Sequence, residues 1–575
     1  MLSRFIFCIF TIKNMSHMKK NNSVKYYTQL YVSFSDLFPE EDIPDLQSVL
    51  VHYSRQTIIN VVLAINNNFG DGKVSNFGIF FSSDNKEQYN EILKRFFKFR
   101  EHSLHDRTEY YFASFITGLE LLRCSFSLPS ETIDEYPKET FEWNLFRAIL
   151  IINEQTICRY QANETVNKYE FLYLNNFCYV EFGKDIKTFA IQQYCYAYYF
   201  FKFLENTNEK TLSLLSAFQS CYGTTWRKYI LSLMAVYTLS FNYKGRLKAD
   251  LKIDVDHLIS KTVLDKISMS PNDIFKYKSD NREDRTGNSD YRFFREFPLI
   301  KENGNYILYS SMIILGKIYN GLFFDLQNIN RGLPKKERIG DIKNLIQEQF
   351  IQNYLLVNFI VEISKRDIIY TEEMMKSHYP QKSNKELGAP DLLLLAHKYC
   401  IIFECKDIKF NGWIKEQKDW EVIQQELNAK ILGSAEQDHK GIGQLTGHIK
   451  NIRNENFHWA KIASGKKIYP VLLLSDPSLI QEGFYGIAKE KYEESLNNKN
   501  VRKISANRPL IIMSPITLIK YKELFQKKGF VYYFEKYYSW LNVTHQYEFS
   551  FEHFMGFKKF TKDKLIMNIL EDIKK

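Results

Sequence analysis

The sequence lacks paired cysteines. Its eight cysteines are scattered along the chain, and none belongs to a Cys-x-x-Cys pair or to a Cys/His cluster. Structural zinc sites need such clusters, and a disulfide framework needs paired cysteines in an oxidising compartment. The absence argues against both, and it predicts reduced, buried thiols in a cytoplasmic protein.

Long apolar runs are also absent. No stretch reaches the roughly 18 uncharged apolar residues of a membrane span, so no membrane partner is expected. The first residues imitate a signal peptide, but Thr11 and Lys13 interrupt the apolar run and no small-residue cleavage site follows. Because Met15 and Met18 could each be the true start, we expect residues 1–18 to be dispensable.

Several common catalytic motifs are missing. The chain has no GxxxxGK[ST] phosphate loop, no GxSxG, no HExxH and no GxGxxG after a strand. The nearest approach, ASGKKI at residues 463–468, lacks both the leading glycine and the hydroxyl group. These absences argue against phosphate-loop, serine-hydrolase, zinc-peptidase and dinucleotide chemistry.

Positive charge is concentrated in the C-terminal part. The net charge is +10, from 77 Lys and Arg against 67 Asp and Glu. Residues 331–575 carry 39 basic and 30 acidic residues, a net charge of +9, which leaves 38 and 37, or +1, for residues 1–330. This asymmetry suits a polyanion-binding domain beside a neutral one, although lysines retained for solubility would give a similar count.

The N-terminal part reads mainly as helices. Residues 45–65, 142–160 and 225–241 have apolar residues at intervals of three and four, the pattern of helix faces buried against one another. No catalytic constellation occurs there. We therefore predict a mainly helical recognition or regulatory domain over residues 19–330.

Turn signals divide the end of this part. Residues 275–292 are polar and predict an exposed loop or hinge. Asn303-Gly304 lies between two apolar runs and predicts a hairpin with a type I′ turn, and a helical pattern follows at 311–327. The charged stretch at 330–341 marks the predicted domain boundary.

Residues 331–575 combine helices with strongly apolar strands. Uninterrupted runs such as DLLLL, CIIF and VLLL are typical of a central sheet covered by helices on both faces, so the predicted class is α/β. The expected order is a helix, three strands, a helix and a strand, with one further strand after them. The corresponding stretches are residues 341–360, 361–370, 391–395, 400–406, 434–452, 468–476 and 508–515, with a polar helical stretch at 412–431 after the third strand.

Three ionisable residues mark the ends of the most hydrophobic hairpin, GAPDLLLLAHKYCIIFECK. If the chain turns at His397-Lys398, paired positions sum to 795, and Asp391 lies directly opposite Glu404. Opposed residues share a face, with Cβ atoms ~5 Å apart. Lys406 is two residues from Glu404 and points to that face as well. A slip of one residue would turn Asp391 to the other face.

This grouping suits a metal ion. Two neighbouring carboxylates repel unless a cation or a proton lies between them, and their oxygens are ligands that Mg²⁺ prefers, with Mn²⁺ as a substitute. The backbone carbonyl of Cys405 could supply a further oxygen. Lys406 could orient or deprotonate a water, whose pKa the metal ion would lower.

The same residues carry a resemblance to a known family. Pro390-Asp391, followed after 12 residues by Glu404-Cys405-Lys406 on the next strand, resembles the PD-(D/E)xK nuclease superfamily. The resemblance covers residues 335–520. It implies a restriction-endonuclease-like central mixed sheet flanked by helices in the C-terminal half, and a PD-(D/E)xK nuclease domain over residues 331–575.

The resemblance also assigns roles. It implies that Asp391 and Glu404 bind one or two Mg²⁺ ions and that Lys406 acts on the attacking water. The first core helix of the family often carries an acidic ligand, for which Glu348 is the natural candidate. The second often carries a glutamine, and Gln444 fits that position.

Residue 448 departs from one branch of this family. RecB-type members have Gln-x-x-x-Tyr, whereas this chain has His448 in place of the tyrosine. We expect His448 to be a partly exposed helix residue rather than a ligand. Four basic residues are candidates for a groove that binds the nucleic-acid backbone: Lys503, Arg508, Lys520 and Lys522.

The leading hypothesis is a Mg²⁺-dependent nuclease acting on nucleic acid, with DNA as the expected substrate. The helical N-terminal half would then supply substrate selection, regulation or contacts in a homo-oligomer or with a partner subunit. A nuclease domain joined to such a partner domain resembles phage-defence effectors. Two alternatives stay open: a nuclease-fold protein that only binds DNA, and an interaction protein whose helical half is the functional part.

Overall fold

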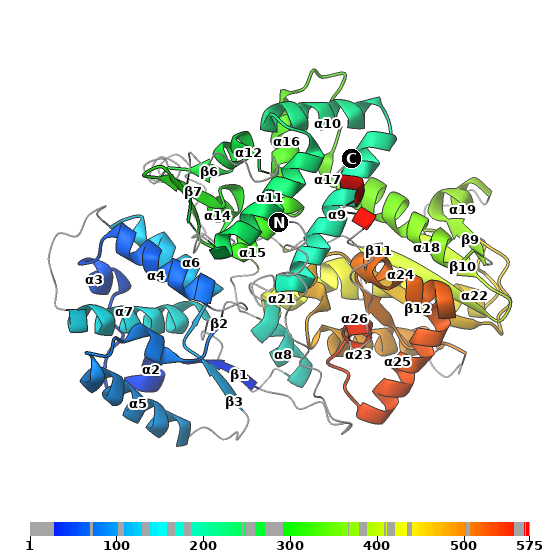
Figure 1. Ribbon diagram of the computed structural model, residues 1–575. Coiled ribbons are helices and arrows are strands. Elements are labelled where there is room, and N and C mark those ends of the chain that lie inside the picture. The colour runs from blue at the N-terminus through cyan, green and yellow to red at the C-terminus, as the bar shows by residue number, and fades with distance from the viewer. Residues whose placement is uncertain are drawn as a thin grey trace. The chain divides into compact units, whose positions relative to one another are not determined.

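The structure is a computed structural model (Figure 1). It describes residues 28–68, 73–101, 108–128, 138–157, 167–177, 186–242, 246–248, 259–270, 291–365, 367–378, 388–406, 410, 414, 420–433, 440–501, 506–556, 568–569 and 571–573. Contacts divide the chain into two compact units. Unit 1 comprises Met1–Gln161, Lys184–Gln193 and Gln219–Leu322, and unit 2 comprises Ala162–Gly183, Tyr194–Phe218 and Phe323–Lys575.

Unit 1 is mainly helical, as predicted, with short strands between the helices. Its elements are β1 (Thr28–Tyr31), α2 (Phe34–Leu37), α3 (Leu46–Leu50), α4 (Arg55–Asn68), β2 (Lys73–Val74), η1 (Phe77–Phe80), α5 (Lys86–Glu101), β3 (Thr108–Tyr111), β4 (Ala113–Ser114), α6 (Phe115–Ser125), α7 (Lys138–Ile152), η2 (Asn153–Ile157), α11 (Trp226–Asn242), β5 (Arg246–Lys248), α12 (Lys261–Lys266), β6 (Ser268–Met269), α14 (Arg292–Glu296), β7 (Leu299–Glu302), β8 (Asn305–Leu308) and α15 (Ser311–Ile318). Helices α9 (Ile186–Asn206) and α10 (Glu209–Tyr222) contribute to both units.

The hairpin predicted at Asn303-Gly304 is confirmed. Strands β7 and β8 pair antiparallel, with Glu302 opposite Asn305, in a sheet of order β5-β8-β7-β6. Both turn residues have positive φ, 47° for Asn303 and 72° for Gly304, as a type I′ turn requires. The predicted hinge at 275–292 lies almost entirely outside the described residues.

The helical pattern predicted at 311–327 is confirmed, but the chain forms two helices there. Helix α15 ends at Ile318 and α16 begins at Leu322. The amide of Gly321 donates to the carbonyl of Gly316 at 3.0 Å, which closes a turn between the helices. Glycine accepts such turns without a steric cost, so the apolar periodicity alone did not reveal the break.

Unit 2 contains a five-stranded mixed sheet of order β13-β12-β11-β10-β9. Strand β10 pairs antiparallel with β9 and β11, while β11, β12 and β13 run parallel, and the strands β9 to β12 lie side by side in Figure 1. Its elements are α8 (Lys168–Phe177), α16 (Leu322–Gly332), α17 (Ile342–Asn344), η4 (Leu345–Leu356), α18 (Val357–Ile363), β9 (Ile368–Thr371), α19 (Glu372–His378), β10 (Leu392–Leu395), β11 (Tyr399–Lys406), α21 (Trp420–Leu427), η5 (Asn428–Leu432), α22 (Ile442–Arg453), β12 (Lys467–Leu474), η6 (Pro477–Ile480), α23 (Phe484–Asn498), β13 (Ile511–Met513), α24 (Pro515–Lys528), α25 (Phe530–Thr544) and α26 (Phe551–Gly556).

The predicted helices and strands occur in the predicted order, but α19 lies between β9 and β10, and α23 lies between β12 and β13, and neither was predicted. The predicted strand at 361–370 is wrong in its first half, because α18 continues to Ile363 and β9 begins only at Ile368. A short apolar run fits a helix as well as a strand, so periodicity could not place this boundary. The α/β class holds, and the described residues of each unit form one mixed sheet.

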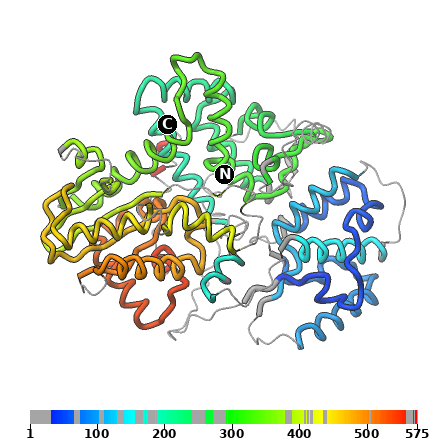
Figure 2. Tube along the Cα trace, turned by 180° about the vertical axis from the view of Figure 1, so that it is seen from behind, coloured from blue at the N-terminus to red at the C-terminus, as the bar shows by residue number. Residues whose placement is uncertain are grey.

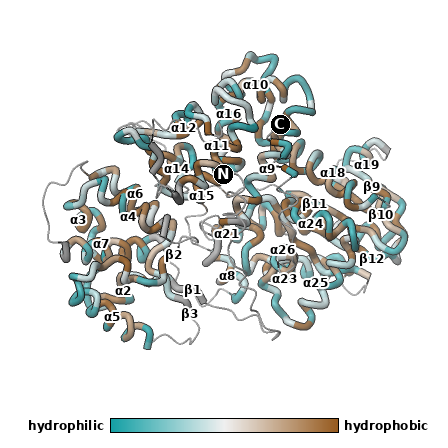
Figure 3. The backbone as a smooth tube through the Cα atoms, in the orientation of Figure 1, coloured by the Kyte–Doolittle hydropathy of each residue, from teal (hydrophilic) through white to brown (hydrophobic). Residues whose placement is uncertain are grey.

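Helices cover both faces of the five-stranded sheet. Phe403 of β11 contacts Phe530 of α25 with ring centroids 6.1 Å apart, so the odd-numbered positions of β11 face α25. On the other side α22 and α23 pack next to each other (Figure 2). Hydrophobic residues line the strands between these layers (Figure 3), and Leu392, Phe403 and Leu472 are fully buried.

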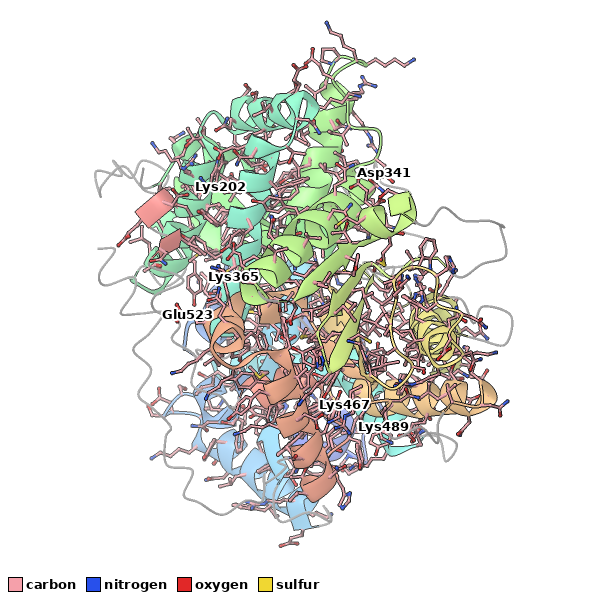
Figure 4. The ribbon with its side chains drawn as sticks, turned by 90° about the vertical axis from the view of Figure 1, so that its right-hand side faces the viewer. Lys202, Asp341, Lys365, Lys467, Lys489 and Glu523 are labelled. Carbon is pink, nitrogen blue, oxygen red and sulfur yellow. The ribbon has the colours of Figure 1, made fainter. Side chains whose placement is uncertain are left out.

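Segments of the N-terminal half complete the core of unit 2. Phe200 of α9 contacts Phe350 of η4 with ring centroids 5.1 Å apart, and Tyr173 of α8 contacts Phe484 of α23 at 5.5 Å. Lys202, labelled in Figure 4, forms an ion pair of 3.0 Å with Asp572. The compact unit therefore includes more than residues 331–575, and the domain boundary near residue 330 stays a prediction.

No helix among the described residues is both long enough and apolar enough to cross a membrane.

Candidate active site

The hairpin of β10 and β11 has the predicted register. Leu392 pairs with Phe403 and Leu395 with Cys400, so paired positions sum to 795. The amide of Ala396 donates to the carbonyl of Tyr399 at 3.0 Å and leaves a two-residue loop. Extended by one residue, this register puts Asp391 directly opposite Glu404. The loop length on which the predicted site depended is confirmed.

Asp391 is anchored by two hydrogen bonds. Its Oδ2 accepts from the backbone amide of Cys405 at 2.6 Å, and its Oδ1 accepts from Nε2 of Gln352 at 2.9 Å. Burial raises the pKa of Asp391 to about 6, although the charge of Lys406 and the Cys405 amide both act to lower it. The carboxylate is thus held in place, but its surroundings disfavour its charge.

Glu404 is the most confined ionisable group of the site. Its side chain is fully buried, and its Oε1 accepts a hydrogen bond of 2.5 Å from Nζ of Lys406. Its other oxygen, Oε2, is buried without a hydrogen-bond partner. Burial and the charge of Asp391 raise the pKa of Glu404 well above its ordinary value, and Lys406 only partly opposes this shift.

Lys406 forms an ion pair with Glu404 and keeps its own charge. Burial acts to lower the pKa of Lys406, but the charges of Glu404 and Asp391 outweigh burial and raise it. Its side chain is 24% exposed, which leaves the ammonium within reach of a ligand from outside. The site therefore presents one fully buried carboxylate, one half-buried carboxylate and one ammonium at the same end of the hairpin of β10 and β11.

Two further residues belong to this group, and the sequence did not reveal them. Glu372 follows β9 directly, and its amide donates to the carbonyl of Asp391 at 3.2 Å. Because Thr371 pairs with Leu392, the register puts Glu372 opposite Asp391. Nε2 of Gln352 bridges the two carboxylates, at 2.9 Å from Asp391 and 3.3 Å from Glu372. Three acidic residues thus form a row across three neighbouring strands.

Glu372 forms an ion pair within its own helix, because its Oε1 lies 2.5 Å from Nζ of Lys376 one turn later on α19. Its charge also raises the pKa of both Asp391 and Glu404. The acidic pair Glu372-Glu373 at the end of an apolar run was the available signal. It identified no partner, because the register of β9 was unknown.

The first core helix contributes a different residue from the one predicted. Glu348 is exposed on η4 and accepts a hydrogen bond from the side chain of Asn344. Gln352, four residues later on the same segment, is the one that bonds Asp391. The assignment of Glu348 as a metal ligand stays a prediction.

Gln444 and His448 lie on α22, four residues apart and hence on one face of the helix. Gln444 is half-buried in the first turn. The expectation that His448 is partly exposed is wrong, because its side chain is fully buried. The surrounding core, including Phe457 at 5.7 Å between ring centroids, encloses it. The sequence shows that His448 lies on a helix, but it does not show that this face of the helix packs into the core.

The basic residues predicted to form one groove lie in different parts of the structure. Arg508 pairs with Glu535 at 2.7 Å, and its amide bonds the carbonyl of Ile468 at 3.0 Å. Ile468 lies near the start of β12, where Figure 4 labels Lys467, whereas Leu474 pairs with Lys406. Six residues of strand separate these points, or ~20 Å. Arg508 is therefore at the opposite end of the sheet from Lys406.

The other three basic residues differ in their surroundings. Lys522 pairs with Glu362 and lies 5.4 Å from the ring centroid of Phe359. Lys520 lies 5.8 Å from the ring centroid of Tyr521. Lys503 is outside the described residues. Their assignment to nucleic-acid binding stays a prediction.

Within the described residues, no group of three or more His, Cys, Asp and Glu side chains is arranged to hold one metal ion. Comparison with known proteins found no matching protein family, no matching curated protein and no matching solved structure.

Proposed function

We propose that unit 2 is a metal-dependent nuclease of the restriction-endonuclease-like fold that hydrolyses phosphodiester bonds of nucleic acid. The mixed sheet supports this proposal, because its antiparallel hairpin and parallel neighbours follow the element order expected for PD-(D/E)xK nucleases. The register of β10 and β11 supports it as well, since it brings Asp391 and Glu404 together with Lys406.

One observation carries the proposal. Glu404 is fully buried and one of its two oxygens has no hydrogen-bond partner, while Asp391 lies opposite it. Burying a polar atom without a partner costs roughly 1–3 kcal/mol, and a second carboxylate nearby adds to that cost. A divalent cation between the two carboxylates would offset both. The donor set fits Mg²⁺, which commonly binds one or two carboxylates and takes its other ligands from water and substrate phosphate.

Each residue then has a defined task. Asp391 and Glu404 would hold Mg²⁺ or Mn²⁺, with the carbonyl of Cys405 as a further oxygen. The bound ion would supply charge neutralisation at the phosphate and a lowered pKa for the attacking water. Lys406 would orient that water by donating a hydrogen bond from its ammonium.

The residues around the carboxylates would keep them in place. The amide of Cys405 and the side chain of Gln352 bond the two oxygens of Asp391, which fixes the carboxylate on the side of Glu404. Such supporting hydrogen bonds orient metal ligands and tune their affinity. Gln444 lies in the first turn of α22 and would contact the substrate or the attacking water.

The net charge of +9 over residues 331–575 suits a polyanion, which supports a nucleic-acid substrate, and we propose DNA as that substrate. The helical N-terminal half would select the substrate, regulate cleavage or form oligomer contacts. A role in defence against phage or other foreign DNA rests on the arrangement of a nuclease domain beside such a half, and we propose it on that ground alone.

The test compares purified wild type with Glu404→Ala and Lys406→Ala on circular DNA, single-stranded DNA and RNA. Each substrate is incubated with Mg²⁺, with Mn²⁺ and with EDTA. We expect wild type to cleave DNA only with a divalent ion, and each variant to lose on the order of 10³-fold in rate while its circular dichroism is unchanged. Cleavage by Glu404→Ala at the wild-type rate would refute the proposal. DNA binding that needs no metal, without any cleavage, would favour the binding-only alternative.

A further inference from the structure

His448 is a buried side chain with unused hydrogen-bonding capacity. None of its surface is exposed, and both ring nitrogens lack a hydrogen-bond partner. Among the described residues it is the only histidine with two such buried nitrogens. A neutral imidazole has one donor and one acceptor nitrogen, so both functions are left unsatisfied. An apolar ring would fill the same space at a lower cost in free energy.

The fold directs this ring towards the candidate active site. At the C-terminal end of α22, Arg453 donates to the carbonyl of Lys466 at 2.8 Å, beside the start of β12. Helix α22 packs against β12, the neighbour of β11, and the charge of Arg453 acts to lower the pKa of the Cys400 thiol, which points to the even-numbered face of β11, so α22 lies on that face. His448 is one and a half turns earlier in the helix, towards the other end of the strand. Glu404 and Lys406 lie on that face at that end.

The electrostatics agree with this placement. Burial lowers the pKa of His448 to about 3, and the charge of Lys406 is the next cause, followed by that of His458. The ring is therefore neutral at physiological pH and keeps one nitrogen lone pair as an acceptor. A neutral acceptor near an ammonium is a suitable hydrogen-bond partner for it.

We propose that His448 is a positioning residue that accepts a hydrogen bond from the ammonium of Lys406 when a divalent cation binds the carboxylate of Glu404. This inference rests on the proposed function. Nζ of Lys406 bonds the same carboxylate that the cation would need, at 2.5 Å. A cation bound at the free Oε2 would repel the ammonium on Oε1, and the imidazole provides an alternative acceptor for it. Because His448 is fully buried, it acts through Lys406 and does not touch the nucleic acid.

The proposal predicts opposite effects on stability and on metal binding. Replacement His448→Phe removes two unsatisfied polar atoms and keeps an aromatic ring, so we expect the metal-free Tm to stay equal or rise. The ammonium then has no alternative acceptor and stays on Glu404. A hydrogen bond to a charged group is lost in the metal-bound state, so we expect the Kd for Mg²⁺ and Mn²⁺ to rise roughly 10- to 100-fold.

The experiment uses the full chain and isothermal titration with MgCl₂ and with MnCl₂, together with thermal melts with and without metal. His448→Asn and His448→Gln each restore an acceptor atom at one of the two nitrogen positions. We expect one of them to recover most of the metal affinity. The matched control is His458→Phe, which makes the same change in a ring whose centroid lies 4.2 Å from that of Trp459, and it should leave the Kd unchanged. Cleavage of circular DNA by His448→Phe should show a lower kcat at saturating metal with KM for DNA unchanged.

The outcomes separate this inference from the function it rests on. If wild type binds metal and cleaves DNA while His448→Phe does both equally well, the inference is refuted and the nuclease proposal stands. If His448→Phe does not fold, the Asn and Gln variants decide, and loss of metal affinity in both refutes the acceptor role. If wild type neither binds a divalent ion nor cleaves any substrate, both proposals fail.

Discussion

Two carboxylates, one in each unit, accept hydrogen bonds from lysine, yet their pKa values are shifted in opposite directions. In unit 1, Asp265 accepts hydrogen bonds from Lys301 at 2.7 Å, from Lys261 at 2.9 Å and from Tyr306 at 2.6 Å. Burial acts to raise the pKa of Asp265, but the three donors outweigh it and lower the pKa below its ordinary value. In unit 2, Glu404 has one lysine, one unbonded oxygen and a raised pKa.

The difference shows that an ion pair alone does not distinguish structure from function. Asp265 is partly exposed and surrounded by donors, so the native state stabilises its charge. Glu404 is enclosed, lies opposite a second carboxylate and is undersupplied with donors, so the native state disfavours its charge. A buried carboxylate with a raised pKa and a second carboxylate beside it is a candidate functional residue. A carboxylate whose oxygens are all bonded to donors is a structural element.

The largest expected effect is the loss of cleavage on Glu404→Gln. The amide has the same shape but cannot bind Mg²⁺ as a carboxylate does, so we expect cleavage of circular DNA to fall on the order of 10³-fold or more. The metal-free Tm should not fall, because the replaced group is one whose charge the fold disfavours. A gel assay and a thermal melt measure the two quantities. If Glu404→Gln instead melts lower and cleaves normally, Glu404 is a structural residue like Asp265.

Asp391 should make the stability of the metal-free protein depend on pH. Its folded pKa of about 6 exceeds its ordinary value of 3.8, so the native state binds the proton more tightly than the unfolded state. Its contribution is therefore favourable at low pH and is lost as the pH rises from about 4 to about 6, by up to ~3 kcal/mol. Urea unfolding of metal-free wild type and Asp391→Asn at several pH values measures it. The free energy of unfolding of Asp391→Asn relative to wild type should increase from about pH 4 to about pH 6. A difference that stays constant with pH would contradict the raised pKa.

The sequence could predict those parts of the fold that tight turns determine. The two-residue loop at His397-Lys398 sets the register of β10 and β11, and Asn303-Gly304 sets that of β7 and β8. In each case a local feature determines which residues face each other. The position of Asp391 opposite Glu404 follows from this without any knowledge of the rest of the chain.

Residues contributed by distant elements could not be predicted in this way. Strand β9 is joined to β10 through α19 and a further stretch of chain, so no turn fixes the position of Glu372. Gln352 and Glu348 have the same helical period, and only the packing of η4 decides which of them reaches Asp391. The burial of His448 likewise depends on how α22 lies on the sheet. Patterns reveal faces and registers, whereas contacts between separate elements depend on the assembled core.

Gln352 offers a test of intermediate size. Replacement Gln352→Leu keeps the approximate volume but removes the hydrogen bond that joins Asp391 to Glu372. Supporting hydrogen bonds of metal ligands are typically worth 10- to 100-fold in affinity or activity, so we expect a loss of that size in Mn²⁺ affinity and in cleavage rate. Glu348→Leu on the same segment is the matched control. If Glu348→Leu causes the larger loss, Glu348 is the acidic residue that the resemblance predicts, and Gln352 is secondary.

The smallest expected effect belongs to the saturated carboxylate of unit 1. Asp265→Asn keeps the shape but weakens the attraction to Lys301 and Lys261, and partly exposed ion pairs contribute little. We expect a loss of about 1 kcal/mol or less at neutral pH, with no change in DNA cleavage. The lowered folded pKa stabilises the native state above the unfolded pKa, and this contribution is lost as the pH falls through the folded value. The difference between wild type and variant in urea unfolding should therefore shrink below pH ~4. A gap that instead widens in acid would mean that Asp265, like Glu404, carries a charge that the fold disfavours.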